Sequence, residues 1–546
     1  MAEGHSVKNR SRNAQFAKMP LLVLLGLGTG LATALAISLF RWMVELPDLL
    51  FIEFELTHDS PWIRFSVPVV GVTLLWLFWR SQHSATRRVG VTHLYEHLSY
   101  HHGELPLRNV LNQLVGAVFA IGTGQPVGRE GPGVHIGAAL SSWLGVRAGI
   151  SYNYQRLLIG CGSAAAIAAL FNTPLAGVLF AMEVILLEYS LTGFTAIIVA
   201  AISADAVTRH LFGAPELLGF GLGNGTVFEQ LPILVLLALC IGFAGLVFQQ
   251  IIVTLASHRS KYLSINLLAA GLLIGGLAVY DPGLMTPVHI VMQETLQGVY
   301  TGDHLILLAC FYLLVPPIVL GLGIPGGLIG PSLTSGALIG ALIGVAVSGF
   351  DIPVHITTMS LIGMAAMLSA VIHAPLAALI AVFELSGSIQ TLTLAMTVIV
   401  LSDLMMRSLF KKPSIFERLL MAQGLSRDTH LYRRVMMSTS VQELMDRSLS
   451  DRRSGTANER FTSNWYLVKG EEGDRLLSHS ELEQSEAALD EDNRFVMVDV
   501  KSSLFQALDQ LQSESCDRLV ITNKRGVLLG VLTRKEIDLF YRNAEI

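Results

Sequence analysis

Charged residues are scarce in this sequence. Asp, Glu, Lys and Arg together make up 14% of its 546 residues, against about 25% in ordinary soluble domains. Hydrophobic residues make up 52%. This balance excludes a soluble fold over the whole length, and we expect most of the chain to lie in a lipid bilayer.

Cysteine clusters and a strong net charge are also lacking. The four cysteines are scattered, without the spacing of a disulfide framework or a zinc site, so we expect no metal and a packing role for them. The formal net charge of −5 gives no support for a nucleic-acid partner. No Ser/His pair or paired catalytic carboxylates have a recognisable spacing, which argues against an enzyme. The four cysteines are Cys161, Cys240, Cys310 and Cys516.

The apolar residues gather in long runs. After the polar residues 1–18, the first run extends over residues 19–40, which is long enough to cross a bilayer as a helix. Acidic residues fill the segment 45–60, and basic residues follow the second run, which ends near Trp79. Because basic segments stay on the cytoplasmic side, we predict a multi-pass protein of the inner or plasma membrane with cytoplasmic N- and C-termini.

An ionisable pair stands inside this apolar region. Arg129 and Glu130 lie between Gly128 and Gly131, and Pro132 follows at what we predict to be the first helical position. A helix N-terminus at membrane depth offers unpaired N–H donors and a partial positive charge, which together attract an anion. Glu130 can occupy such a site when ionised and leave it when protonated or displaced. We therefore predict a gate; the alternative is a carboxylate that only satisfies the helix start.

The chain repeats itself at an offset of about 200 residues. Pro174 through Glu183 matches Pro375 through Glu384, and Gly131-Pro132 matches Gly330-Pro331. Two similar halves, each with a glycine-rich break before a Pro-led helix, are typical of inverted-repeat transporter folds.

The composition turns charged and polar near residue 424, which predicts a soluble cytoplasmic tail. Its end shows a helical stripe over 504–511, a strand over 518–522, a second strand over 527–532 and a helix opening at Thr533. An earlier, poorer copy precedes this unit. The predicted domains are 1–18, a cytoplasmic segment; 19–423, the membrane domain, with repeats at about 19–225 and 226–423; and 424–546, the tail, with its second copy at about 495–546.

Three of these motifs resemble the CLC family of chloride channels and proton/chloride exchangers. They are residues 128–132, 326–331 and 172–183, and the resemblance covers about 20–423. The tail resembles the paired CBS domains of many members. The resemblance implies an all-α polytopic membrane fold of the CLC type, with an inverted repeat of broken and tilted helices, plus a small α/β tail. It also implies a homodimer with one pore per subunit.

The resemblance further implies that Glu130 is the gating glutamate and that backbone amides hold the anion. The family's central-site serine falls at Val89 and its pore-closing tyrosine at Phe416, so both hydroxyl donors to the central anion are missing. Their loss weakens anion binding by about 0.5–1.5 kcal/mol each. A hydroxyl of Thr92 or Thr123 is an alternative donor. The amides are those of Gly128, Arg129, Gly131, Leu328, Ile329 and Gly330.

Proton coupling is the point on which the sequence departs from many exchangers. Their inner proton-site glutamate falls at Val184, and a valine cannot relay a proton. We therefore favour a glutamate-gated chloride channel, voltage- or pH-gated; the alternative is a proton-coupled chloride antiporter, because Glu130 is intact. Glu183 is expected to be structural, since Glu384 holds the equivalent place. A membrane-anchored nucleotide sensor is a remote third reading, because an anchor has no use for the buried charges at Arg129 and Glu130.

Other polar residues carry two readings each. His135, His373, Glu188 and the His-containing stretch 93–102 offer pH sensitivity near neutrality. We expect each of them instead to be an interfacial or packed polar residue.

The end of the tail carries a stretch that resembles the ribose-binding segment of CBS domains. Its candidate contacts to an adenine nucleotide are Gly530, Thr533 and Glu536. Thr533 and Glu536 also have the spacing of a helix capping box, which is needed with or without a ligand. The first copy lacks the glycine in its stretch 475–481, so both readings stay open.

Overall fold

The computed structural model describes the chain as two compact units. The first comprises Lys18–Ala148 and Arg156–Arg427, and the second comprises Met1–Ala17, Gly149–Gln155 and Asp428–Ile546. Not described are residues 1, 54–59, 102, 190, 214–226, 260–261, 349–354, 426–435, 437–438, 453–462, 471–472, 484–493, 515, 524–525 and 545–546.

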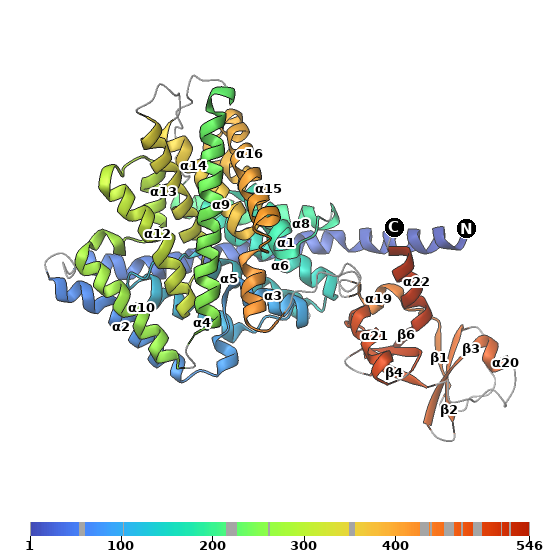
Figure 1. Ribbon diagram of the computed structural model, residues 1–546. Helices are drawn as coiled ribbons and strands as arrows, with labels where there is room; N and C mark the ends of the chain where they lie inside the picture. Colours follow the sequence, from blue (N-terminus) through green and yellow to red (C-terminus); the bar gives the residue numbers. More distant parts are fainter. Residues whose placement is uncertain are drawn as a thin grey trace. The chain divides into compact units, whose positions relative to one another are not determined.

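The first unit is helical throughout its described part (Figure 1). Its first half contains α1 (Ala2–Glu53) from Lys18 onward, α2 (Pro61–Arg80), the 3₁₀ turn η1 (Ser84–Arg87), α3 (Gly90–Tyr100), α4 (Leu107–Ile121), α5 (Glu130–Ala148), α6 (Tyr152–Phe171) from Arg156 onward, α7 (Pro174–Phe180), the π-helical η2 (Ala181–Leu186) and α8 (Leu191–Phe212). Its second half contains α9 (Val227–Ser257), α10 (Leu263–Tyr280), the 3₁₀ turn η3 (Pro282–Met285), α11 (Val288–Leu296), α12 (Gly302–Leu322), α13 (Ile329–Val347), α14 (Ile356–Ile372), α15 (Pro375–Ser386), α16 (Ile389–Leu404), the π-helical η4 (Met405–Leu409) and α17 (Ile415–Ala422).

Within the described residues, nine helices are long and apolar enough to cross a membrane. Four further apolar helices of 10–17 residues are too short to do so alone. Breaks in the helices follow the sequence signals: α6 and α14 each end before a Pro-led helix, at Asn172 and His373, whose φ angles of 54° and 65° are left-handed. The expected broken, multi-pass helical architecture is confirmed.

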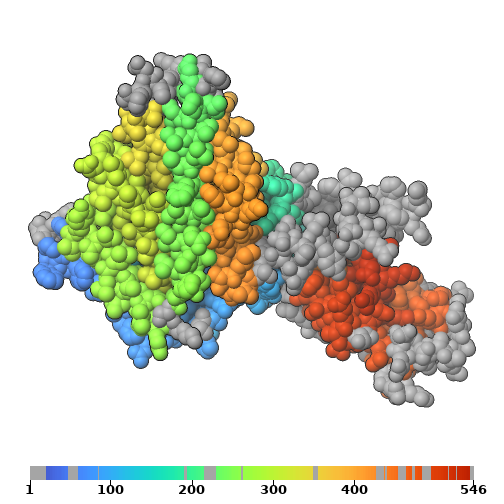
Figure 2. Space-filling view, viewed as in Figure 1, coloured from blue at the N-terminus to red at the C-terminus, as the bar shows by residue number. Residues whose placement is uncertain are grey.

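One face of this unit is a wall of long helices. Figure 2 shows α9 in green running the height of the unit beside α16 in orange. Large apolar side chains point outward along both helices, which is the composition that a lipid environment requires. They include Leu236, Leu239 and Phe243 on α9 and Met396, Val400 and Leu404 on α16.

Close helix packing explains why some positions in the membrane helices are glycine. Where α13 crosses α14, a Cβ added to Gly336 would lie 2.4 Å from the carbonyl oxygen of Gly363. Only glycine allows two backbones to approach this closely.

Each of the two sequence repeats caps the N-terminus of a helix in the other repeat. The Glu183 carboxylate in η2 accepts hydrogen bonds from the N–H groups of Leu376 and Ala377 in the first turn of α15, at 3.2 and 2.9 Å. The Glu384 carboxylate in α15 accepts two from the first turn of α7, at 2.9 and 2.8 Å. The predicted structural role of Glu183 is confirmed, and these crossed caps tie one half of the unit to the other.

The second unit contains two small sheets of the same design. In each sheet the first strand pairs parallel with the second, which pairs antiparallel with the third. The predicted helix over 504–511 and the two final strands are confirmed, and strands β1 and β4 were not foreseen. The elements are α19 (Val441–Leu444), β1 (Leu449–Asp451), β2 (Trp465–Gly470), β3 (Gly473–Ser478), α20 (His479–Glu483), β4 (Phe495–Asp499), α21 (Leu504–Ser513), β5 (Arg518–Thr522), β6 (Leu528–Thr533) and α22 (Arg534–Ala544).

An ion pair connects the two sheets of this unit. Arg518 in β5 donates hydrogen bonds to both carboxylate oxygens of Glu481 in α20, and to the carbonyl oxygen of Leu476 at 2.7 Å. These donated hydrogen bonds lower the pKa of Glu481 to about 2.

Candidate anion-binding site

The two glycine-rich breaks lie side by side. The Gly128 N–H donates to the Gly327 carbonyl oxygen at 2.8 Å, and the Gly327 N–H donates back to the Gly128 carbonyl oxygen at 2.6 Å. Helices α5 and α13 begin two residues beyond this bridge, at Glu130 and Ile329. The N-terminal ends of two helices, one from each half, therefore meet at one buried place.

The prolines do not sit where the sequence predicted. Each helix starts two residues earlier than expected, so Pro132 and Pro331 occupy the third helical position and not the first. Both still lie in the first turn, whose N–H groups have no intrahelical partner, so a residue without an N–H is tolerated there.

Glu130 occupies the meeting point. Its side chain is buried, with 2% of the residue's surface exposed, and its Oε2 accepts a hydrogen bond from the Gly330 N–H at 3.0 Å. A Cβ added to Gly330 would lie 2.5 Å from the same oxygen, so a larger residue here would displace the carboxylate from its present position. Glu130 thus occupies one of the amide donors that the sequence predicted for an anion.

One predicted donor is wrong: the Gly128 N–H is already bonded to the Gly327 carbonyl oxygen at 2.8 Å, so it is not available to an anion. The remaining predicted donors lie around the Glu130 contact. Leu328 caps α13, Ile329 and Gly330 are its first two residues, and Gly131 is the second residue of α5. Such N–H groups point along the helix axis away from the helix body, and the two helix dipoles add a partial positive charge at the same place.

Arg129, the residue before Glu130, belongs to a group of charged side chains. Its side chain is 11% exposed, and its Nη1 lies 3.5 Å from Oε1 of Glu45 in α1. The same oxygen lies 3.9 Å from Nε of Arg41. With Glu130 next to Arg129, two guanidinium groups here face two carboxylates.

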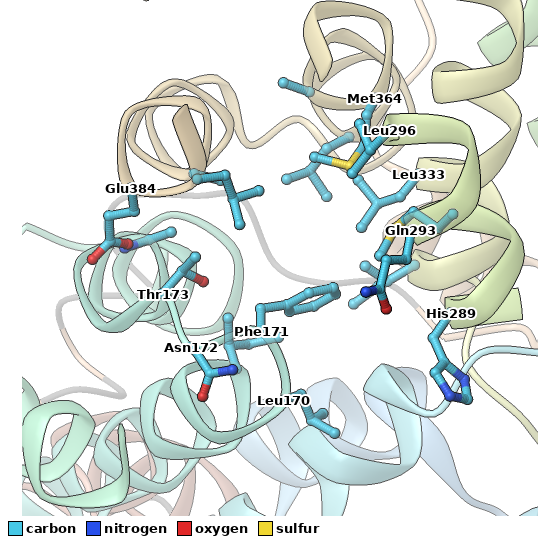
Figure 3. A pocket seen from close by; sticks show the side chains of 18 of the residues that line it. Leu170, Phe171, Asn172, Thr173, His289, Gln293, Leu296, Leu333, Met364 and Glu384 are labelled. Atoms are coloured by element: carbon cyan, nitrogen blue, oxygen red, sulfur yellow. The ribbon is translucent and has the colours of Figure 1, made fainter. Parts of the chain in front are cut away.

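A cavity of about 880 Å³ adjoins this charged group. Arg129 and Ile329, the neighbours of Glu130 and Gly330, both line it. Figure 3 shows Phe171 reaching into the middle, with Glu384 and His289 at opposite ends. Arg41 and Arg209 also line the cavity, as does the acidic Glu384, and Arg209 forms an ion pair with Asp205 at 2.6 Å.

The two positions that lack hydroxyl groups take ordinary structural places. Val89 is the N-cap residue of α3, and Phe416 is buried in α17 with its ring centroid 5.7 Å from that of Tyr95. Sequence reasoning missed Tyr95, whose hydroxyl donates to the carbonyl oxygen of Val184. The Thr123 hydroxyl donates a hydrogen bond to the carbonyl oxygen of Phe119, four residues before it, at 2.6 Å.

The tail candidates make contacts within the protein. The Thr533 N–H donates to Oε2 of Glu536 at 2.8 Å, and the Glu536 N–H donates to Oγ1 of Thr533 at 3.3 Å. The capping box is therefore present. A Cβ added to Gly530 would lie 2.4 Å from the carbonyl oxygen of Asp446, so this glycine has a packing reason too. Nucleotide binding at these residues stays a prediction.

The remaining polar candidates separate in space. Glu188 forms an ion pair with Arg156 at 3.5 Å. His373 ends α14 in its left-handed conformation. His135 is fully buried in α5 and contacts a second histidine, His93.

Comparison with known proteins agrees with this geometry. A family model described as voltage gated chloride channel matches residues 69–407. A ClcB-like relative from Ralstonia nicotianae is 28% identical over 342 residues, which cover 60% of this chain and 79% of the relative. The H(+)/Cl(-) exchange transporter ClcA of Vibrio vulnificus is 29% identical over 287 residues, which cover 50% of this chain and 61% of the exchanger's own length.

Solved structures share the fold. A eukaryotic CLC transporter matches with a TM-score of 0.64 and 19% identity over 95% of this chain and 98% of its own. A slow cyanobacterial Cl−/H+ antiporter matches with a TM-score of 0.65 and 20% identity over 74% of this chain and 97% of its own. From its sequence match, its helical architecture and its paired helix ends, the chain belongs to the voltage gated chloride channel family, the CLC family of anion-transport proteins.

Proposed function

We propose that this protein exchanges chloride or a similar small anion for protons across a membrane, with Glu130 as both gate and proton carrier. One observation carries the proposal: the buried Glu130 carboxylate accepts the Gly330 N–H at the helix end where an anion would bind. The sequence alone favoured a channel. The relatives named H(+)/Cl(-) exchange transporters shift the preference to the exchanger.

Competition for the same donors couples the two ions. An ionised Glu130 and a chloride ion are both anions, so the helix ends hold one of them at a time. Hydrogen bonds to a charged acceptor are worth about 1.5–3 kcal/mol, and a neutral carboxylic acid loses most of that advantage. Protonation of Glu130 therefore releases the donors to chloride, and departure of chloride favours loss of the proton and return of the carboxylate.

The cavity supports an anion route to this gate. Ile329, the neighbour of Gly330, lines it together with Arg41 and Arg129, which share the single carboxylate of Glu45 and would attract anions. Amide donors and helix dipoles select for negative charge and size more than for chemical identity, so chloride is proposed from the family and not from the donor set.

A channel is the second candidate, and Val184 favours it. The residue is buried, and its carbonyl oxygen accepts the Tyr95 hydroxyl. The side chain has no titratable group at the place where the resemblance puts the inner proton site of many exchangers.

Flux measurements on the full chain in liposomes distinguish the two. A chloride electrode and a pH electrode record both ions while a chloride gradient drives transport. Uphill proton movement at a fixed ratio to chloride is expected for an exchanger. Glu130→Gln should abolish that proton movement and leave a chloride flux that no longer depends on pH. Chloride flux without protons in the unmodified protein would favour the channel.

For the tail we infer a CBS-like pair, because its two sheets share one strand order. An adenine nucleotide is its proposed ligand, bound near Gly530. Calorimetric titration of the full chain with ATP tests this, with no heat of binding as the contradicting result. We also propose a homodimer with cytoplasmic termini.

A further inference from the structure

Three side-chain amides lie on one face of α4. Asn109, Asn112 and Gln113 occupy positions i, i+3 and i+4 of this helix, so they share a face. All three are buried, with exposed fractions of 3%, 3% and 0%. Because buried amides are normally hydrogen-bonded, the partners of each one indicate what this face does.

Two of the three amides hold the segment that leads into α3. The Asn109 side-chain nitrogen donates to the carbonyl oxygens of Ala85 and Arg88 at 3.1 and 2.8 Å. The Asn112 side-chain nitrogen donates to the carbonyl oxygen of Thr86 at 2.8 Å. These hydrogen bonds fix the main chain on which the N-terminus of α3 is built.

Gln113 is the exception on this face. Neither its side-chain oxygen nor its side-chain nitrogen has a hydrogen-bond partner among the described residues. Its Oε1 lies 3.8 Å from the place that a Cβ would take on Gly90, the first residue of α3. The amide therefore faces the start of α3 at van der Waals distance. A buried amide without a partner costs free energy, so its presence here needs a reason.

The start of α3 lacks a side-chain cap. Its N-cap residue is Val89, which makes no cap hydrogen bond. The N–H groups of a first helical turn have no intrahelical partner, and the helix dipole adds a partial positive charge there. Gly90 enters the helix with a left-handed φ of 84° and has no Cβ, so no side chain of its own separates the helix end from Gln113. By the family resemblance, Val89 is also the position beside the central anion.

The hydroxyl groups of Tyr95, in α3, and of Thr123, just after α4, already donate to carbonyl oxygens. Their acceptors belong to Val184 and Phe119. Gln113 has two N–H groups and no acceptor for either among the described residues. The oxygen and nitrogen of an amide exchange places when the group rotates about its last bond, a torsion with a broad energy profile. The NH₂ group can therefore turn toward an anion at the start of α3.

Helix α4 also touches the second glycine-rich break. Three residues after Gln113, a Cβ added to Gly116 would lie 3.0 Å from Cγ of Pro325, which precedes Gly327 by two residues. Residues i and i+3 share a helix face. One face of α4 thus meets both the start of α3 and the chain that enters α13, where Glu130 is held.

We propose that the Gln113 side chain donates a hydrogen bond to an anion held at the N-terminus of α3, and so supplies a donor in place of the hydroxyls missing at Val89 and Phe416. This rests on the proposed anion transport, in either its exchanger or its channel form. The ligands at this place are neutral N–H groups in a buried setting. They suit a small, singly charged ion such as chloride better than a multiply charged one.

Calorimetric titration of the detergent-solubilised full chain with chloride tests the proposal. Gln113→Met keeps the length of the side chain and removes its N–H groups. We expect chloride binding to be weaker by at least about tenfold, as for loss of one hydrogen bond to a charged partner. Gln390→Met, at an exposed position of α16, is the matched control and should bind chloride as the unmodified protein does.

Thermal unfolding of the same variants separates binding from packing. Replacement of an unpaired buried amide by an apolar group of similar shape is not destabilising. The unfolding midpoint of Gln113→Met without chloride should therefore equal or exceed that of the unmodified protein, while its chloride binding weakens. A lower midpoint together with unchanged chloride affinity would show a packing role and overturn the proposal.

Gln113→Leu is measured if Gln113→Met does not fold, and failure of both to fold overturns the donor role. Chloride affinity within about twofold of the unmodified protein's in a folded variant also overturns the role of Gln113, and leaves the transport function standing. Absence of both chloride binding and chloride flux in the unmodified protein overturns the transport function and the donor role together.

Discussion

Gly330 shows how the candidate site depends on a side chain that is not there. Its N–H holds the Glu130 carboxylate, and its Cα faces the same carboxylate oxygen without a Cβ between them. A glycine at this position therefore serves the proposed gate in two ways: it supplies the donor, and it leaves room for the acid that we propose competes with the anion.

Replacement of this glycine should act on the gate. In Gly330→Ala the new Cβ would lie 2.5 Å from Oε2 of Glu130, too close for the carboxylate to remain. We expect chloride flux that depends little on pH and carries about tenfold fewer protons, in line with loss of one positioned proton group. Liposome flux with both electrodes measures this. Gly276→Ala is the control, because its Cβ would meet no atom within 4 Å; normal coupling in Gly330→Ala would contradict the proposed competition.

At the residue scale, sequence reasoning found what local motifs encode. Glu130 and its glycines stand in one short segment, so their proximity needed no knowledge of the fold. Tyr95 and the contact between His93 and His135 were not found, because they join segments that only packing brings together. Thr123 was offered as a substitute hydroxyl, and its bond to a local carbonyl could not be foreseen without coordinates.

Helix ends are the elements that carry this architecture. Four of them form two matched pairs: α5 with α13 at the gate, and α7 with α15 at the crossed carboxylates. In the second pair each half of the membrane unit supplies the cap that the other half lacks, so neither end is complete within its own repeat.

Removal of either cap should therefore destabilise the whole membrane unit. Glu183→Ala and Glu384→Ala each leave two N–H groups without their carboxylate, at a cost of about 1–2 kcal/mol. Thermal unfolding of the detergent-solubilised protein should show a midpoint lower by a few degrees. Glu104→Ala, an exposed residue, is the control. Equal midpoints for all three variants would contradict the crossed-cap role.

The ion pair between α20 and β5 gives the tail a predictable pH response. The folded pKa of Glu481 is about 2, below the value of about 4.3 for an unfolded glutamate. Its stabilising contribution is therefore complete above pH of about 4.3 and is lost as the pH falls toward 2. Glu481→Gln should lower the unfolding midpoint of the tail at pH 7 by a few degrees, and the difference from the unmodified protein should shrink at pH 3. A pH-independent difference would exclude this linkage.

At the element scale, helices and hairpins were predictable and parallel pairings were not. Strands β5 and β6 follow one another through a turn, so alternation and turn residues located them. Strands β1 and β4 pair in parallel with strands well beyond them in the chain. Such pairing leaves no local signal in the sequence. The early starts of α5 and α13 were also missed, because Pro132 and Pro331 are compatible with any position in a first turn.

The whole membrane unit builds its candidate site from a single chain. Gly128, Glu130 and Gly330 come from both halves of the same polypeptide, and no second copy is needed to complete the geometry. The expected homodimer would then contain two independent sites.

Mixed dimers test that independence. Co-expression of unmodified and Glu130→Gln chains under two affinity tags yields dimers with one altered subunit. We expect about half the coupled proton flux of the unmodified dimer, since each subunit carries its own gate. Sequential purification on both tags followed by liposome flux gives the measurement. A complete loss of proton coupling would show that the subunits act together.

The two hydrogen bonds between Gly128 and Gly327 use main-chain atoms alone. A side-chain substitution leaves both main-chain amides in place. A mutational scan would therefore detect steric clashes at these glycines but not the contribution of the two hydrogen bonds. Ordinary mutagenesis therefore cannot measure the main-chain bridge that keeps the two helix N-termini at a fixed separation. Only a change to the backbone, such as an ester in place of an amide, would reveal its strength.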